Sequence, residues 1–355
     1  MDFDGIPELT KAINLSLSQF FEAESGYLQS VGEELYPVAD ALGHFLLDSG
    51  KRLRPLFAAI GYLGTGSALT PEVIRAAASL ELVHVCALIH DDVMDDSDTR
   101  RGAPAIHKQF ESLHSEKSLH GSAPQFGVAA SILMGDLALI WAAKALHEAG
   151  IPSSQLLKTL PIYDQMRVEL MAGQYLDVYE QALASESVER SLKVATYKSG
   201  RYSIERPLHF GASLSAICEP IHLETYSHYG LPLGQAFQLR DDVIGVFGDP
   251  EVTGKPAGDD LREGKRTVLA ALTLNKSNET QRSEFNKLFG RKDLAHNDIS
   301  TLRQIIIDTG ALADLEQIIA DKTAEALTAI ETSQIDQAAA SMLNTMAIAA
   351  TQRSS

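Results

Sequence analysis

Residues 80–98 read LELVHVCALIHDDVMDDSD, a strongly apolar run that ends in a cluster of aspartates. Five of the eight residues from 91 to 98 are aspartate. If the apolar run is helical, Asp91 and Asp95 lie on the same face, separated by a rise of about 6 Å. Carboxylates at this spacing repel each other unless a cation lies between them. A solvated acidic helix end is the alternative interpretation for a single pair of aspartates.

A second run repeats this order of features 150 residues further along the chain. Residues 233–245 read LGQAFQLRDDVIG, so Asp241 and Asp242 end an apolar run and precede a glycine-rich loop that contains lysine. Mg²⁺ is typically shared between carboxylates and substrate phosphates. Two such clusters facing each other across a cavity would suit a diphosphate ester. Together the runs predict a site for divalent metal and diphosphate.

Composition and charge restrict the class of protein. The 355-residue chain is 45% hydrophobic and 22% charged, which is typical of a soluble globular protein. It contains no run of about 18 uninterrupted apolar residues, so we expect no transmembrane segment, and the acidic N-terminus does not resemble a signal peptide. Cys86 and Cys218 lie in apolar, helix-like contexts, which indicates buried thiols in a reducing compartment. We therefore expect a cytoplasmic enzyme.

Basic residues must attract any anionic substrate, because the net charge is −17. This charge also argues against a nucleic-acid partner. Residues 50–55 read GKRLRP, with three cations before a predicted helix whose first turn suits Pro55. Further cations near predicted helix ends or in loops are Arg100, Arg101, Lys198, Lys255 and Lys265. For any one of them alone, a solvated basic surface is the alternative interpretation.

Apolar residues recur at three- and four-residue spacing through much of the chain, while strand signals are scarce. We predict a single all-α domain over residues 1–355. The expected helices lie near 8–22, 27–47, 54–65, 71–96, 128–148, 153–181, 188–198, 202–217, 221–247, 267–288, 299–309, 311–332 and 335–351. Two long loops, about 97–127 and 248–266, each follow an aspartate cluster, where lids are often found.

Six motifs occur in a fixed order between about residues 50 and 267. They are residues 50–55 (GKRLRP), 91–102 (DDxxD with RRG), 173–177 (GQxxD), 198–200 (KSG), 234–242 (GQxFQxxDD) and 254–267 (GK with KRT). This series resembles the trans-isoprenyl diphosphate synthases, and most of all the bacterial geranylgeranyl diphosphate synthases. The resemblance implies an all-α isoprenoid synthase fold, in which helices surround a central active-site cavity, and a homodimer.

The resemblance also implies a reaction and residue roles. The enzyme would condense isopentenyl diphosphate head-to-tail with dimethylallyl, geranyl or farnesyl diphosphate and release diphosphate. The implied Mg²⁺ ligands, catalytic together with Lys198, are Asp91, Asp92, Asp95, Asp241 and Asp242. Residues matching the allylic diphosphate site are Arg100, Lys198, Ser199, Gln238, Lys255 and Lys265. Residues matching the isopentenyl diphosphate pocket are Lys51, Arg54, His84 and Arg101.

The sequence departs from the commoner family pattern at Gly245, where many members carry a third aspartate. Asp249 lies one helical turn further on and is a candidate to replace it. Asp260 matches a family aspartate that contacts a metal through water, and Asp259 is its neighbour. These carboxylates are the candidates to assist the metals.

Product length is argued from the helix that precedes Asp91. A growing chain would pass Ala87 and Cys86, then Val83, at about one isoprene unit per 5.4 Å helical turn. No aromatic residue at 86 or 87 closes this path, so we predict the C20 product, geranylgeranyl diphosphate. The modest bulk of Val83 leaves C25 or longer products open. Ordinary helix packing is the alternative role for Cys86 and Ala87.

Two other functions remain as alternatives. A class I terpene cyclase shares the all-α architecture and an aspartate-rich motif, but it needs no isopentenyl site, so Lys51, Arg54 and Arg101 argue against it. A non-catalytic subunit of a heteromeric synthase usually lacks one aspartate cluster, whereas this chain has both.

Overall fold

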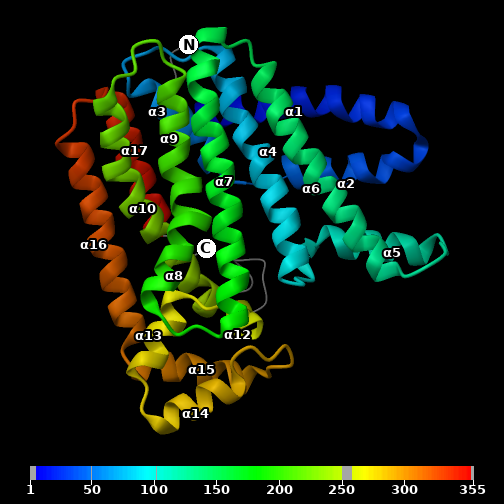
Figure 1. The fold of residues 1–355 in the computed structure, drawn as a ribbon, viewed down its shortest axis with the longest axis vertical. Helices are drawn as coiled ribbons and strands as arrows, with labels where there is room; N and C mark the ends of the chain where they lie inside the picture. Colours follow the sequence, from blue (N-terminus) through cyan, green and yellow to red (C-terminus); the bar gives the residue numbers. More distant parts are fainter. Residues whose placement is uncertain (1–4, 49, 101, 250–257, 353–355) are drawn as a thin grey trace. The chain divides into compact units, whose positions relative to one another are not determined.

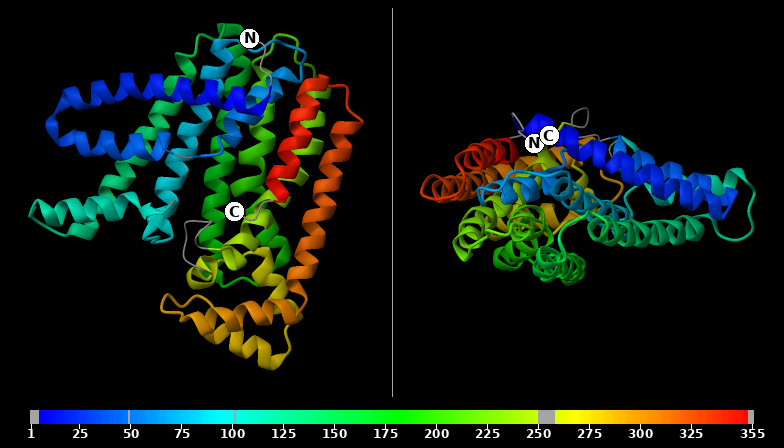
Figure 2. Two further views of the ribbon diagram at one scale, coloured as in Figure 1. Left: turned by 180° about the vertical axis from the view of Figure 1, so that it is seen from behind. Right: turned by 90° about the horizontal axis from the view of Figure 1, so that it is seen from above.

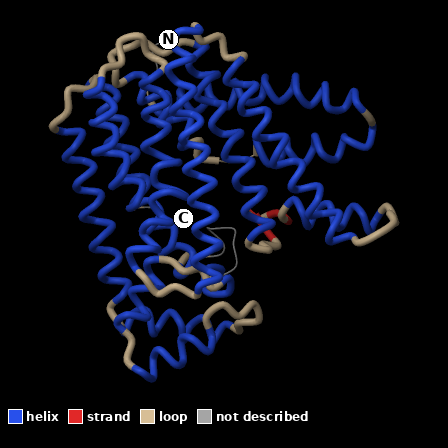
Figure 3. The backbone as a smooth tube through the Cα atoms, viewed as in Figure 1, coloured by secondary structure: helices blue, strands red, loops and turns tan. Residues whose placement is uncertain are grey.

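The computed structural model describes residues 5–48, 50–100, 102–249 and 258–352. Within these residues the fold is almost entirely helical (Figure 1), and the only strands are β1 (Thr99–Arg100) and β2 (Ala103–Pro104), which pair antiparallel (Figure 3). The all-α prediction is confirmed. The chain forms two compact units, unit 1 (Met1–Leu160 with Pro207–Glu219) and unit 2 (Pro161–Arg206 with Pro220–Ser355). The expectation of a single domain stays a prediction.

Unit 1 is built around the helix that carries the first aspartate cluster. Its elements are α1 (Ile6–Val31), the 3₁₀ helix η1 (Glu33–Leu35), α2 (Tyr36–Leu47), α3 (Leu53–Leu63), α4 (Pro71–Met94), α5 (Ile106–Glu116), α6 (Ala123–His147), the start of α7 (Ser153–Leu183) and most of α9 (Arg206–Ser213). α1 and α2 fold back on each other as a helical hairpin (Figure 2). α4 packs against α1, α3, α5 and α6, so its position is fixed on several sides.

The sequence of α4 explains why it is the core helix of this unit. The Thr70 hydroxyl accepts a hydrogen bond from the Val73 amide at 3.4 Å and caps the helix start, where Pro71 occupies the first turn. Leu80, Val83 and Cys86 are completely buried. A helix that is apolar on all sides is a buried helix. α4 and α6 both have the length and hydropathy of a membrane span, but 72% of the apolar window of α4 is buried inside the protein.

Unit 2 contains the second aspartate cluster on another long helix. Its elements are the rest of α7, α8 (Val188–Val194), the π-helix η2 (Ala195–Glu205), α10 (Pro220–Phe247), α12 (Asp259–Glu263), α13 (Val268–Lys276), α14 (Glu279–Leu288), α15 (His296–Asp308), α16 (Ala311–Glu331) and α17 (Gln337–Thr351). α10 and α16 run side by side (Figure 1). Arg240 on α10 donates to Glu316 on α16 at 2.6 and 2.7 Å and to the Thr351 carbonyl at 2.8 Å. These bonds tie the aspartate-bearing end of α10 to its neighbours.

Several predicted boundaries were wrong for identifiable reasons. The loop expected at 97–127 contains the β1–β2 hairpin and α5, whose buried face is Ile106, His107, Phe110 and His114. Because two of those four side chains are histidines, an apolar periodicity does not reveal this helix. The helix expected at 267–288 is two helices, since Asn278 caps the start of α14 with a capping box.

Further corrections concern the N-terminus, Cys218 and the second loop. The first helix continues to Val31, although a break was expected after residue 22. Cys218 is half-buried and lies between α9 and α10, so the expected buried helical thiol was wrong for this residue. The loop expected at 248–266 contains α12, and its residues 250–257 lie outside the described part of the chain.

Candidate active site

The first aspartate cluster lies at the C-terminal end of α4. Arg100, in β1, folds back onto it: its Nε donates to Asp92 Oδ1 at 2.8 Å, its Nη2 also bonds Asp92, and Nη2 lies 3.6 Å from Asp91 Oδ2. Burial lowers the pKa of Arg100, but the carboxylates of Asp92, Asp91 and Asp95 outweigh this effect and raise the pKa overall. The β1–β2 hairpin therefore adds a permanently charged guanidinium to the acidic helix end.

The basic stretch before α3 divides into two kinds of cation. Lys51 is exposed, whereas Arg54, within the first turn of α3, is buried with 9% of its surface exposed. Arg52, between them, is 3% exposed and adopts a left-handed backbone with φ of 51°. It is a structural residue rather than a substrate contact, because its side chain is turned into unit 1 and bonded there.

Arg52 makes hydrogen bonds to three different helices. Its Nη1 donates to Glu81 Oε1 on α4 at 2.8 Å, its Nη2 to the Leu46 carbonyl on α2 at 2.7 Å, and its Nε to Asn14 Oδ1 on α1 at 2.8 Å. Sequence reasoning missed this role. The available signal was Glu81, a carboxylate inside the otherwise apolar run of α4, which a buried position permits only with a partner. His84, one turn after Glu81, is half-buried.

The second aspartate cluster is at the C-terminal end of α10. Asp242 is 5% exposed and accepts a hydrogen bond from Gln238 Nε2 at 2.9 Å. Burial raises the pKa of Asp242 to about 8, although the hydrogen bond from Gln238 opposes the rise. Negative charge on the nearby carboxylates of Asp260, Asp241 and Asp177 raises it further. Carboxylates from α7, α10 and α12 are thus concentrated in unit 2.

Gly245 is explained by the packing of α12 on α10. A Cβ atom at residue 245 would lie 2.1 Å from Asp260 Oδ2, so a side chain there would require the Asp260 carboxylate to move. Asp260 therefore brings a carboxylate to the place where a third aspartate of α10 would begin. Lys265 Nζ lies 3.7 Å from Asp260 Oδ1 and 2.7 Å from Glu263 Oε2, which supplies positive charge beside this group.

Lys198 and Ser199 lie on η2, which packs closely against α7. Lys198 Nζ donates to Asp177 Oδ2 at 2.7 Å. A Cβ atom at Gly173, one turn before Asp177, would lie 2.3 Å from the Lys198 backbone nitrogen, so glycine is required for this approach. The motifs at 173–177 and 198–200 thus pack against each other. A helix break was expected here, but α8, η2 and α9 are continuous.

The residues predicted to control chain length are packed differently from one another. Cys86 is fully buried, with its Sγ 3.8 Å from His90 Nδ1. Burial, with the charge of Asp136, raises the pKa of this thiol to about 12. His90 bonds the Ile132 carbonyl of α6 at 3.1 Å and so ties α4 to α6. Val83 is buried and Ala87 half-buried, and the role of these three residues in chain length stays a prediction.

Comparison with known proteins decides the family. The sequence model of the polyprenyl synthetase family matches residues 37–306. The chain belongs to this family. A short chain isoprenyl diphosphate synthase of Methanocaldococcus jannaschii is 30% identical over 290 residues, covering 80% of this chain and 82% of that protein. A geranylfarnesyl diphosphate synthase of Aeropyrum pernix is 32% identical over 274 residues, covering 76% and 79%.

A solved structure is similar over its whole length. The geranylgeranyl pyrophosphate synthase from Corynebacterium glutamicum, complexed with isoprenyl diphosphate and magnesium, has a TM-score of 0.92 and 40% identity, covering 99% of this chain and 100% of that one. The present polyprenyl synthetase is accordingly a trans-prenyltransferase with the all-α isoprenyl synthase fold.

The donor set of this polyprenyl synthetase suits a hard divalent cation. Both clusters offer carboxylate oxygens, and the buried Asp242 stands among three other carboxylates whose repulsion a cation would relieve. Within residues 5–48, 50–100, 102–249 and 258–352, no three His, Cys, Asp or Glu side chains already converge as a metal site. The suitability of these residues for a divalent cation therefore rests on the chemistry of their carboxylate oxygens. Arg101 and Lys255, two predicted substrate contacts, lie outside the described residues.

Proposed function

We propose that this polyprenyl synthetase is a geranylgeranyl diphosphate synthase. It joins isopentenyl diphosphate head-to-tail to dimethylallyl, geranyl or farnesyl diphosphate, with Mg²⁺ as cofactor, and releases diphosphate. The carrying observation is that each carboxylate cluster has its own cation, Arg100 beside Asp92 in unit 1 and Lys198 beside Asp177 in unit 2. A cluster with carboxylates for metal and a cation for phosphate oxygens suits a substrate that is itself a metal-bound polyanion.

The proposed roles are those that the family resemblance implies for these residues. Bound Mg²⁺ would stabilise the charge that develops on the departing diphosphate. The ligands are Asp91, Asp92, Asp95, Asp241 and Asp242, with the allylic diphosphate contacted by Arg100, Lys198, Ser199, Gln238, Lys255 and Lys265. Isopentenyl diphosphate is bound by Lys51, Arg54, His84 and Arg101. Lys51 is exposed, and the Arg52 anchor fixes the backbone beside it.

The product is proposed to be C20. The 40% identity to the C. glutamicum geranylgeranyl pyrophosphate synthase supports it, as does the absence of an aromatic residue at 86 or 87. The second candidate is a C25 product, because a geranylfarnesyl diphosphate synthase is among the relatives and Val83 is small.

Incubation of the purified protein with Mg²⁺, isopentenyl diphosphate and each allylic diphosphate tests the proposal, with products resolved by chain length. A C20 product from farnesyl diphosphate is expected, and accumulation of C25 would favour the second candidate. Absence of any elongated product would contradict the proposal. Consumption of an allylic diphosphate without isopentenyl diphosphate would indicate a cyclase instead.

A cytoplasmic homodimer is the proposed form of the enzyme. Phe126, Leu133 and Ile140 on α6 are 37%, 68% and 64% exposed, and their seven-residue spacing places them on one face. An exposed apolar helix face of this kind suits a second copy of the chain. Light scattering should give twice the monomer mass, and Leu133→Glu should halve it. A wild-type monomer at micromolar concentration would refute the dimer.

A further inference from the structure

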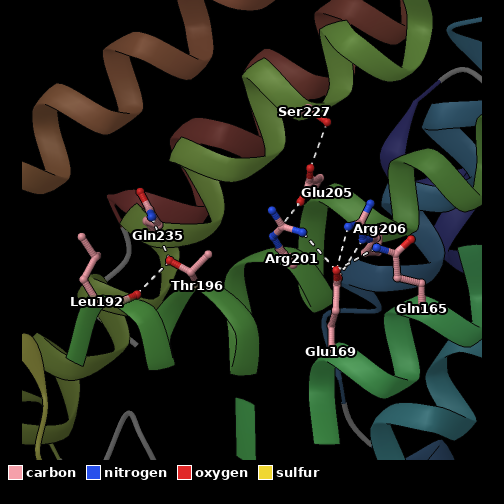
Figure 4. Close-up of polar contacts among 9 residues, drawn as sticks. All are labelled: Gln165, Glu169, Leu192, Thr196, Arg201, Glu205, Arg206, Ser227 and Gln235. Carbon is pink, nitrogen blue, oxygen red and sulfur yellow. Dashed lines mark hydrogen bonds and ion pairs between the residues drawn. The ribbon is translucent and has the colours of Figure 1, made fainter. Parts of the chain in front are cut away.

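One carboxylate on α7 binds two arginines of the neighbouring helical segment. Arg201 Nη1 donates to Glu169 Oε1 at 3.0 Å, and Arg206 donates to the same carboxylate through Nε and Nη2, both at 2.8 Å (Figure 4). Glu169 is 11% exposed and Arg206 10%, so this triad is largely protected from solvent. Charge-assisted bonds of this geometry are among the stronger polar contacts in a protein.

The spacing of the two arginines has a structural consequence. In an α-helix, residues five apart point about 140° away from each other, so one carboxylate cannot readily bind both. Arg201 ends up beside Arg206 because η2 is a π-helix, in which the Arg206 amide donates to the Arg201 carbonyl five residues back. The wider turn places both guanidiniums on the α7 side. Glu169 can therefore bind both arginines while this segment is π-helical. If the segment became α-helical, Glu169 would lose its bond to one of them.

Glu169 shares its helix face with the residues that contact Lys198. Glu169, Gly173 and Asp177 are each four residues apart on α7, which is one face of the helix. Gly173 contacts the Lys198 backbone and Asp177 binds the Lys198 ammonium at 2.7 Å. The arginine anchor and the substrate-binding lysine are therefore set by the same surface of α7.

The opposite side of η2 is held by α10. Gln235 Nε2 donates to Thr196 Oγ1 at 2.8 Å and the Ser227 hydroxyl donates to Glu205 Oε1 at 2.9 Å (Figure 4). Gly200 and Gly234 meet without side chains between them, since a Cβ atom on Gly234 would lie 2.5 Å from the Gly200 Cα. These contacts hold both ends of η2 and Gly200 at its middle, while the Lys198 backbone and ammonium are held by the α7 face.

We propose that Glu169 is a positioning residue that keeps η2 in the π-helical register and so directs Lys198 to the allylic diphosphate. The inference rests on the proposed function, in which Lys198 contacts that substrate. A change of one residue in register rotates a helical side chain by about 100°, which would turn Lys198 away from the Asp177 side. Glu169 acts through Lys198 and does not itself contact substrate.

Glu169→Gln tests the inference, because it keeps the shape of the side chain and removes its charge. We expect the KM for farnesyl diphosphate to rise or kcat to fall by about 10- to 100-fold, the range for a displaced binding group, while the KM for isopentenyl diphosphate is unchanged. Hydrogen exchange should also quicken in residues 195–206. Arg206→Lys, which keeps the charge but loses the two-point contact, should show a smaller effect of the same kind and serves if Glu169→Gln does not fold.

Glu180→Gln is the matched control, because Glu180 lies on the same helix as Glu169 and also binds an arginine. Its partner Arg190, whose Nε donates to it at 2.8 and 2.9 Å, belongs to α8 rather than η2. It should leave both KM values within about twofold of wild type, because its partner Arg190 belongs to α8 and is not among the proposed substrate contacts.

The decisive measurement is a double-mutant cycle with Lys198→Ala. If Glu169 acts through Lys198, then Glu169→Gln adds nothing to the loss caused by Lys198→Ala. Multiplied losses, or equal kinetics for Glu169→Gln and Glu180→Gln, would overturn the positioning role while wild-type elongation stands. A wild-type enzyme that elongates nothing would overturn the proposed function instead.

Discussion

Arg52 and Glu81 form an ion pair at 2.8 Å, with their side chains only 2% and 3% exposed. The pair joins the residue that precedes α3 to the middle of α4. Arg52 lies between Lys51 and Arg54, the two cations predicted to bind isopentenyl diphosphate. Loss of the pair therefore affects both the stability of unit 1 and the backbone of its basic loop.

Glu81→Ala should destabilise the protein by about 3–5 kcal/mol, because it leaves a buried guanidinium without its carboxylate. Urea denaturation followed by circular dichroism measures this change. Glu72→Ala is the control on the same helix, since Glu72 pairs with Arg75 at 2.8 Å but both are well exposed. That variant should cost about 1 kcal/mol or less. Equal losses in the two variants would contradict the buried-anchor interpretation of Arg52.

Asp91→Ala should reduce diphosphate release by about 100-fold or more, if electrostatic stabilisation of the leaving group is lost. The assay is release of diphosphate from isopentenyl plus farnesyl diphosphate at saturating Mg²⁺. Asp314→Ala, on the surface of α16, provides a carboxylate deletion outside both clusters. Wild-type rates from Asp91→Ala would remove this residue from the proposed metal site.

Chelation by EDTA should abolish elongation, and added Mg²⁺ should restore it. The physical reason is that burial, with added repulsion from the neighbouring carboxylates, raises the pKa of Asp242 to about 8, and a bound cation favours the charged forms of these groups. Melting temperature with and without Mg²⁺ gives a readout independent of activity, since a ligand that binds only the folded state raises it. Full activity in EDTA would rule out the cofactor.

Cys86→Phe should shorten the product from C20 to C15, because an aromatic ring would close the path along α4. Chromatographic resolution of products from dimethylallyl diphosphate is the measurement. Cys218→Phe is the matched control, because that cysteine lies outside α4 and is half-buried. An unchanged chain length in Cys86→Phe would refute the pocket argument.

Glu169 predicts a specific pH dependence of stability. Burial raises its pKa, but the bonds and charges of Arg206 and Arg201 outweigh this and lower the pKa below its ordinary value of 4.5. A carboxyl with a lowered folded-state pKa stabilises fully above its unfolded pKa and loses that contribution as pH falls through the folded value. The stability difference between wild type and Glu169→Gln should therefore be constant above pH 5 and shrink below pH 4.5. A difference that does not change with pH would contradict this account.

The site was predictable where its chemistry is local in sequence. Asp91 and Asp95 are one helical turn apart, so the sequence alone places them on one face, and the α4 and α10 helices were expected within a few residues of their ends. Contacts made by distant segments were not predictable in this way. Arg52 could not be separated from Lys51 and Arg54 without the position of Glu81, and the π-helix depends on glycine contacts with α7 and α10.

The Gly245–Asp260 contact makes two sequence positions depend on each other. An aspartate at 245 would meet the Asp260 carboxylate, so Gly245→Asp requires the Asp260 side chain to take another position. In this structure the carboxylate at this place is delivered by α12 rather than by α10. A comparison made position by position would record only the missing aspartate at 245 and would overlook the carboxylate that Asp260 brings beside it.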